Sequence, residues 1–243
     1  MIEKQVSRTK GRKDDEKREV VIEMNYLDTN PYSVLISIGK TRVLCAATTK
    51  NRMPPHVRDT DRGWVAAQYS MLPNSSTQRI NRERVNVKGR TREIERLIGR
   101  SLRAVCELNA MPEESIIVDC DVIQADGGTR TASVTGGFLA LWLLLKDLQN
   151  RNIIKKFPIK DFMAAISVGI VKGRILLDLD SVEDSAAQVD MNMVMTESGR
   201  IAELQATGEE STFDKEQLNG LAELAGKGIK ELIKEQKKAL KII

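Results

Sequence analysis

The sequence predicts an α/β protein of the α+β type, in which sheets pack with helices in a single domain over residues 1–243. Segments rich in β-branched residues alternate with helical segments in the order ββββ-α-β-α-ββ-ββ-α. No long linker divides them, although this order would also permit two similar lobes. With 41% hydrophobic residues, the chain can bury a full core.

The first four strands are expected at Val20–Met24, Val34–Ile38, Arg42–Thr48 and Trp64–Met71. Each is rich in β-branched or aromatic residues, and turns containing Gly, Asn or Pro separate them. The sequence therefore predicts a meander of antiparallel strands.

A helix is expected to begin at Arg90, followed by a strand at Ile116–Ile123. Apolar residues in the helix recur with a 3.6-residue period, whereas charged residues fill the other positions. We therefore expect one face of this helix to pack on a sheet. The apolar positions are Ile94, Leu97, Ile98, Leu102 and Val105.

The segment Asp119–Ser133 runs from that strand through Gly127 and Gly128 into an apolar helix expected at Thr131–Leu148. Paired glycines let the backbone approach a ligand, and the first N–H groups of a helix are unpaired and carry the positive end of its dipole. Arg130 adds a planar guanidinium suited to phosphate oxygens. Taken alone, the pattern fits an anion site and a simple tight turn equally well.

Two hairpins are expected in the second half of the chain. Ala164–Ile170 should pair with Arg174–Leu179, and Met191–Met195 with Arg200–Gln205, each around a turn that contains glycine. A final amphipathic helix should begin near Lys215.

Five carboxylates cluster between the two hairpins, at Asp178, Asp180, Glu183, Asp184 and Asp190. Like charges close together raise one another's pKa unless a cation neutralises them. The cluster is therefore either a solvated, spread-out turn, which composition alone favours, or a group gathered on Mg²⁺.

Positive charge is concentrated in the first part of the chain, where residues 1–103 hold 22 Lys and Arg against 12 Asp and Glu. Such a surface suits a polyanion such as nucleic acid. The segment 73–89 has no helix or strand period, and we interpret it as an arm for a sugar-phosphate backbone. Its basic residues are Arg79, Arg82, Arg84 and Lys88.

Several classes of protein are disfavoured. The single histidine, His56, leaves little for a His-based triad or a multi-His zinc site, and we interpret it as a surface loop residue. Cys45, Cys106 and Cys120 are expected to be buried, reduced thiols. The chain shows no charged-then-apolar leader, and the run Phe138–Leu145 is too short to span a bilayer. We expect a cytoplasmic protein with no membrane partner.

Three separated blocks resemble the ribonuclease PH family: residues 89–104 (GRTREIERLIGRSLRA), residues 119–133 (DCDVIQADGGTRTAS) and residues 183–192 (EDSAAQVDMN). The resemblance runs in order from about Gly11 to the C-terminus. It implies a fold of mixed sheets packed with helices in a duplicated β-α arrangement. It also implies a phosphate-dependent 3′-to-5′ exoribonuclease that trims transfer RNA precursors, assembled as a hexameric ring of three dimers.

The resemblance assigns roles residue by residue. Inorganic phosphate would be the nucleophile, the product a nucleoside diphosphate and Mg²⁺ the cofactor. Asp184 would aid protonation of the leaving 3′ oxygen or bind metal, and Asp190 would hold Mg²⁺. The phosphate-binding residues would be Arg90, Gly128, Thr129 and Arg130, and the RNA-binding arm residues Arg79, Arg82 and Arg84.

Two positions depart from the family pattern, since Lys10 stands where an Asp is expected and Asn74 where a basic residue is expected. Both departures concern RNA contacts more than chemistry. The alternative function is a ring subunit of an exosome-like assembly that binds RNA beside catalytic neighbours. A nucleotide-binding kinase is disfavoured because the chain has no Gly-Lys-Ser/Thr phosphate loop.

Overall fold

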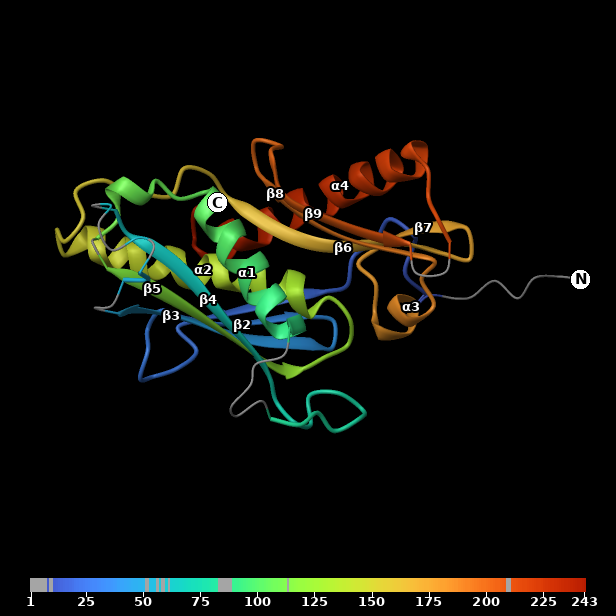
Figure 1. The fold of residues 1–243 in the computed structure, drawn as a ribbon, viewed down its shortest axis with the longest axis horizontal. Coiled ribbons are helices and arrows are strands. Elements are labelled where there is room, and N and C mark those ends of the chain that lie inside the picture. The colour runs from blue at the N-terminus through green and yellow to red at the C-terminus, as the bar shows by residue number, and fades with distance from the viewer. Residues whose placement is uncertain are drawn as a thin grey trace, which may run out of the picture.

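The structure, a computed structural model, describes residues 8, 11–50, 53–55, 57, 60, 62–82, 89–112, 114–208 and 211–243. Two sheets and the helices between and outside them form the fold (Figure 1). Its α+β class confirms the prediction.

The first sheet has five strands in the order β1-β2-β3-β5-β4. Its strands are β1 (Val20–Met24), β2 (Ser33–Ile38), β3 (Thr41–Lys50), β4 (Trp64–Met71) and β5 (Ser115–Gln124). β1, β2 and β3 form the predicted meander, and β5 pairs antiparallel with β3.

The prediction that the fourth strand continues the meander is wrong. β4 lies at the edge of the sheet and pairs parallel with β5, with Trp64 opposite Ser115. Parallel neighbours need a long crossover rather than a tight turn. Here α1 (Gly89–Ala104) lies in that crossover and packs on β4, and a short 3₁₀ turn, η2 (Leu108–Ala110), follows it.

The second sheet has four strands in the order β7-β6-β8-β9. They are β6 (Met163–Val171), β7 (Arg174–Leu177), β8 (Val189–Thr196) and β9 (Ile201–Gly208), and both predicted hairpins are confirmed. A short helix, α3 (Ser181–Ser185), lies between β7 and β8 and was not predicted.

The long apolar helix α2 (Thr129–Asn150) contacts strands of both sheets, whereas α4 (Lys215–Ala239) packs on the second sheet (Figure 1). α4 and α2 meet where the Gln236 side chain donates hydrogen bonds to the carbonyls of Thr135 and Met163. Among the described residues α2 alone has the length and apolar composition of a membrane span, but 78% of that stretch is buried inside the fold. α2 is therefore a core helix.

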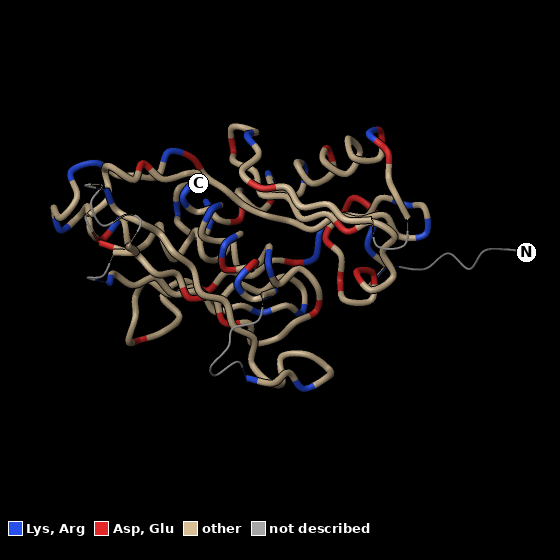
Figure 2. Tube along the Cα trace, viewed as in Figure 1, with Lys and Arg blue, Asp and Glu red and all other residues tan. Residues whose placement is uncertain are grey.

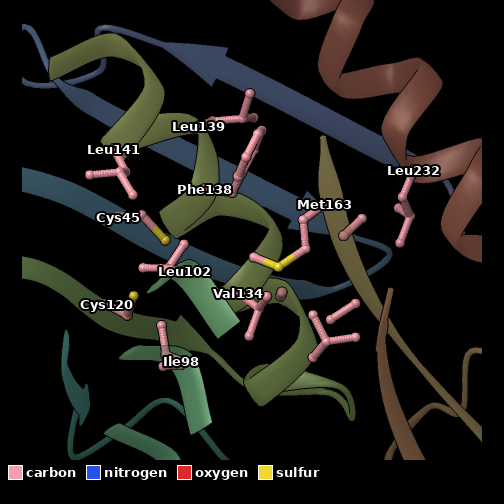
Figure 3. Close-up of a cluster of buried hydrophobic side chains, with 14 of the residues drawn as sticks. Cys45, Ile98, Leu102, Cys120, Val134, Phe138, Leu139, Leu141, Met163 and Leu232 are labelled. Atoms are coloured by element: carbon pink, nitrogen blue, oxygen red, sulfur yellow. The ribbon is translucent and has the colours of Figure 1, made fainter. Parts of the chain in front are cut away.

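Apolar side chains of both sheets and of α1, α2 and α4 form one continuous cluster. Phe138 of α2, fully buried, lies at its centre (Figure 3). Cys45 and Cys120 lie opposite each other on β3 and β5 and are buried here, and all three cysteines are free thiols as predicted.

Candidate active site

α2 begins at a loop shaped for an anion. Gly127 and Gly128 both adopt left-handed backbone angles, with φ of 76° and 69°. No side chain caps the helix at Gly128. The first N–H groups of α2 therefore keep their capacity to bind a negative group, with the positive end of the helix dipole behind them.

The predicted phosphate-binding residues of two helices lie around one tyrosine. The hydroxyl of Tyr69, on β4, donates to Thr129 Oγ1 at 2.9 Å. Burial raises the pKa of Tyr69, and the hydrogen bond to Thr129 and the charges of Arg90 and Arg130 offset only part of that rise. Tyr69 and Arg90 also line the same cavity. The structure thus brings Arg90 of α1 to the start of α2.

The charge at the start of α1 is unusual. Its first turn contains Arg90 and Arg92 and no acidic residue, although the N-terminal end of a helix favours negative charge. Both arginines are exposed. A bound anion would relieve this repulsion, which agrees with the predicted role of Arg90.

Arg130 and Asp190 each contact one of two neighbouring strands of the second sheet. Arg130 Nη1 donates to Gln205 Oε1 at 3.3 Å, and Gln205 on β9 lies opposite Asn192 on β8. The amide of Asn192 in turn donates to Asp190 Oδ2 at 3.2 Å. Asp190 is therefore oriented by a residue of its own strand, β8, and β8 pairs with the strand that contacts Arg130.

Asp184 and Asp190 are the predicted metal ligands. Asp184 is exposed on α3, and Asp190 is half-buried at the start of β8. The described residues contain no group of three or more His, Cys, Asp or Glu side chains arranged to hold a metal. Mg²⁺ is often bound by one or two carboxylates, with water and substrate phosphates as the remaining ligands. Asp184 and Asp190 have the chemistry of such carboxylate ligands.

The other three acids of the predicted cluster are neither solvated nor free to gather on a metal. They are buried against three arginines from the N-terminal segment. Arg8 Nε donates to Glu183 at 2.7 Å, and Arg18 Nη2 to Asp178 at 2.7 Å. We call this set the arginine–carboxylate network: Arg8, Arg12, Arg18, Asp178, Asp180 and Glu183. Both alternatives offered for these three residues were wrong, because their partners lie more than 150 residues away in the sequence.

A cavity of about 700 Å³ adjoins Arg90. Tyr69 and Arg90 form part of its wall, and Asp119 and Asp121 of β5 another part. Burial raises the pKa of both carboxyl groups, and that of Asp119 is raised further by Asp121. The cavity can hold a small-molecule-sized group beside the arginine.

The base of the predicted arm lies close to residues 126–128, which we call the anion loop. Ser75 O accepts a hydrogen bond from Ala125 N at 2.7 Å, one residue before Asp126. Arg79 and Arg82 are exposed beyond this point, and Figure 2 shows basic residues on the arm and along α1. Four residues singled out from the sequence, namely Lys10, His56, Arg84 and Lys88, lie outside the described residues.

Sequence reasoning missed Tyr69, Gln205 and Arg18 as parts of the site. Tyr69 and Gln205 are ordinary members of predicted strands, and nothing local distinguishes them. For Arg18 the only signal was its place in a basic N-terminal segment.

The fold places the starts of two helices, α1 and α2, around one polar site. Family models agree: residues 16–144 match domain 1 of the 3′ exoribonuclease family, and residues 161–228 match domain 2. The chain belongs to the 3′ exoribonuclease family. The prediction of a single structural domain stays a prediction.

Curated relatives include Ribonuclease PH of Bacillus pumilus (strain SAFR-032), which is 55% identical over 226 residues, 92% of this chain and 93% of the relative. Ribonuclease PH of Bacillus subtilis (strain 168) is 54% identical over 233 residues, 95% of each chain. The resemblance found in the sequence is confirmed.

Two solved structures share the fold at low identity. An Archaeoglobus fulgidus exosome with RNA bound to the active site matches with a TM-score of 0.77 and 20% identity, over 95% of this chain and 92% of that one. Rrp46 of rice (Oryza sativa) matches with a TM-score of 0.74 and 16% identity, over 95% and 99%.

We predict that Arg79→Gln with Arg82→Gln weakens binding of single-stranded RNA and makes its salt dependence shallower. Each lost phosphate contact on a single strand reduces the log–log slope by about 0.7, so the pair should reduce it by about 1.4. Fluorescence anisotropy across a salt series measures this. Arg151→Gln, an exposed change at the far end of α2, is the matched control and should leave the slope unchanged. An equal slope in all three proteins would show that the arm makes no backbone contacts.

Proposed function

We propose that this protein is a phosphate-dependent 3′-to-5′ exoribonuclease that trims the 3′ ends of transfer RNA precursors in the cytoplasm. The observation that carries this proposal is the position of Tyr69, which donates a hydrogen bond to Thr129, beside Arg130 at the start of α2, and lines one cavity with Arg90 of α1. Two guanidinium groups and backbone N–H donors form a site for a multiply charged oxyanion. The names of the relatives supply the reaction that such a site would serve.

In the proposed mechanism, the start of α2 holds inorganic phosphate, and Arg130 and Arg90 orient it for in-line attack. A phosphate oxygen attacks the terminal phosphodiester, the bond to the 3′ oxygen of the preceding nucleotide breaks, and a nucleoside diphosphate leaves. Asp184 supplies the proton that the 3′ oxygen takes up. Asp190, oriented by Asn192, would hold Mg²⁺, and the bound ion would supply positive charge to offset that on the scissile phosphate.

The reaction exchanges a phosphate ester for a phosphoanhydride, so it runs close to balance in both directions. The alternative, a ring subunit that binds RNA without cleaving it, is supported only by the likeness of fold to the exosome structures. Such a subunit has no need of both arginines and both carboxylates, whereas this chain has all four.

The purified protein should shorten single-stranded RNA with a free 3′ end only when phosphate and Mg²⁺ are both present. The measurement is chromatography of the released nucleotides, with nucleoside diphosphates as the expected product. Nucleoside monophosphates formed in phosphate-free buffer would identify a hydrolase and contradict the proposal. RNA binding without any release would favour the non-catalytic alternative.

Arg130→Ala and Asp190→Asn should produce defects that respond to different additions. Loss of the charged donor at Arg130 should cost about 2.7–4 kcal/mol, a hundredfold or more in rate, and high phosphate should partly restore it. Asp190→Asn keeps the shape but removes a ligand charge, so raised Mg²⁺ or Mn²⁺ should ease its defect. Rates titrated in phosphate and in metal test this, with thermal melting as the folding control. Near-wild-type activity in either variant would remove that residue from the mechanism.

We further propose a homohexamer built as a trimer of dimers, which is supported by the fold shared with exosome ring structures. Light scattering of the purified protein at micromolar concentration should give about six times the mass of one chain, 27.1 kDa. A monomer with full activity on structured transfer RNA would overturn this assembly.

A further inference from the structure

The anion loop at the start of α2 is held from its rear side by Arg18. Arg18 Nη1 donates a short hydrogen bond to the carbonyl of Asp126, and Nη2 donates to the carbonyl of Gly127 at 3.4 Å. A Cβ added at Gly128 would lie 3.2 Å from the same Nη2 atom. The guanidinium group thus lies directly against the three loop residues.

These contacts set the direction of the N–H groups. In a planar trans peptide the carbonyl and the N–H of the next residue point in opposite directions. Because Arg18 fixes the carbonyls of Asp126 and Gly127, it also directs the N–H groups of Gly127 and Gly128 away from itself. Only glycine fits at position 127, because a Cβ added there would lie 2.4 Å from the carbonyl oxygen of Leu179.

Arg18 also binds Asp178, which directly follows β7 of the second sheet. Nε donates to Oδ2 at 2.9 Å and Nη2 to Oδ1 at 2.7 Å, and the backbone N–H of Arg18 donates to Oδ2 at 2.7 Å. Both side chains are buried, so the carboxylate neutralises the guanidinium. Arg18 therefore orients the loop and adds little net attraction for an anion.

Two further side chains hold the same loop. Thr41 Oγ1 donates to Gly127 O at 2.6 Å and accepts from Asp126 N at 2.9 Å. Ser181, on the helix that contains Asp184, donates to Asp126 Oδ1 at 2.7 Å. The loop is thereby connected to the first sheet, to α3 and, through Arg18, to Asp178.

We propose that Arg18 is a positioning residue for phosphate binding. It fixes the N–H donors of Gly127 and Gly128 relative to Asp178, at the end of β7. This inference rests on the proposed function, because it names what sets the geometry of that same site. Arg18 does not touch the phosphate; it acts through the loop. A lysine cannot replace it, because a single ammonium cannot bind Asp178 in two places and reach both carbonyls.

The test is Arg18→Lys with Arg12→Lys as the matched control. Both residues belong to the arginine–carboxylate network, but Arg12 has no hydrogen bond to the anion loop among the described residues. Arg18→Lys should raise the KM for phosphate at least about tenfold, because sub-ångström errors in donor position are costly. The KM for RNA should stay unchanged. Arg12→Lys should lower the melting temperature and leave the KM for phosphate unchanged.

If Arg18→Lys fails to fold, Thr41→Val provides a second test of the inference. It removes the hydrogen bonds of the Thr41 hydroxyl to the anion loop and leaves no buried charge unpaired. It should raise the KM for phosphate in the same direction. An unchanged KM for phosphate in the folded Arg18→Lys and Thr41→Val proteins would overturn the inference, as would equal increases in Arg18→Lys and Arg12→Lys. A wild-type protein that needs no phosphate would instead refute the proposed function, so the two failures are distinguishable.

Discussion

Neutralisation of buried charge is the constraint on which the site depends. Asp178, Asp180 and Glu183 lie within the fold, and an unpaired buried charge costs several kcal/mol. Arg8, Arg12 and Arg18 supply the compensating charge, so the N-terminal segment has to lie against the end of the second sheet. The network thereby links residues 8–18 to residues 178–183, which are about 160 or more positions away in the sequence.

α2 contributes to both the core and the candidate site. Its sides are buried against both sheets, and Gly136 allows a close approach, since an added Cβ would lie 2.7 Å from Ile36 Cγ2. Only its first turn meets the polar site. An anion bound there would therefore be held by a helix packed against both sheets, which suits chemistry that depends on position more than on a nucleophilic side chain.

Local periodicity accounts for most of what the sequence predicted. Both hairpins and the long helices follow from runs whose spacing matches one kind of element. The parallel pairing of β4 with β5 could not be predicted from periodicity, because side chains alternate in the same way in parallel and antiparallel strands. α3 escaped notice because five residues are too few to show a helical period, although Asp180 and Glu183 form a capping box there.

Local sequence predicts a candidate anion site only where its residues are neighbours in the chain. The glycine pair and Arg130 lie in one continuous segment, whereas the role of Arg90 was assigned through the resemblance to the ribonuclease PH family. The partners of Asp178 and Glu183 could not be predicted, since the residues that neutralise them are about 160 to 175 positions away. Distance along the chain, not weakness of the interaction, limited the prediction.

The parallel pairing of β4 and β5 has a consequence for how this enzyme class can diversify. Parallel neighbours end at the same edge of a sheet, so the arm that follows β4 and the loop that follows β5 leave the fold side by side. The Ser75–Ala125 hydrogen bond fixes the first part of the arm, and α1 fixes its return. The arm between these two anchors and the loop after β5 are separate segments of the chain, so the arm can change in length and charge while that loop keeps its own contacts. The arm, which we propose binds RNA, and the loop after β5, which we propose binds phosphate, can therefore change independently in evolution although both leave the same edge of the sheet.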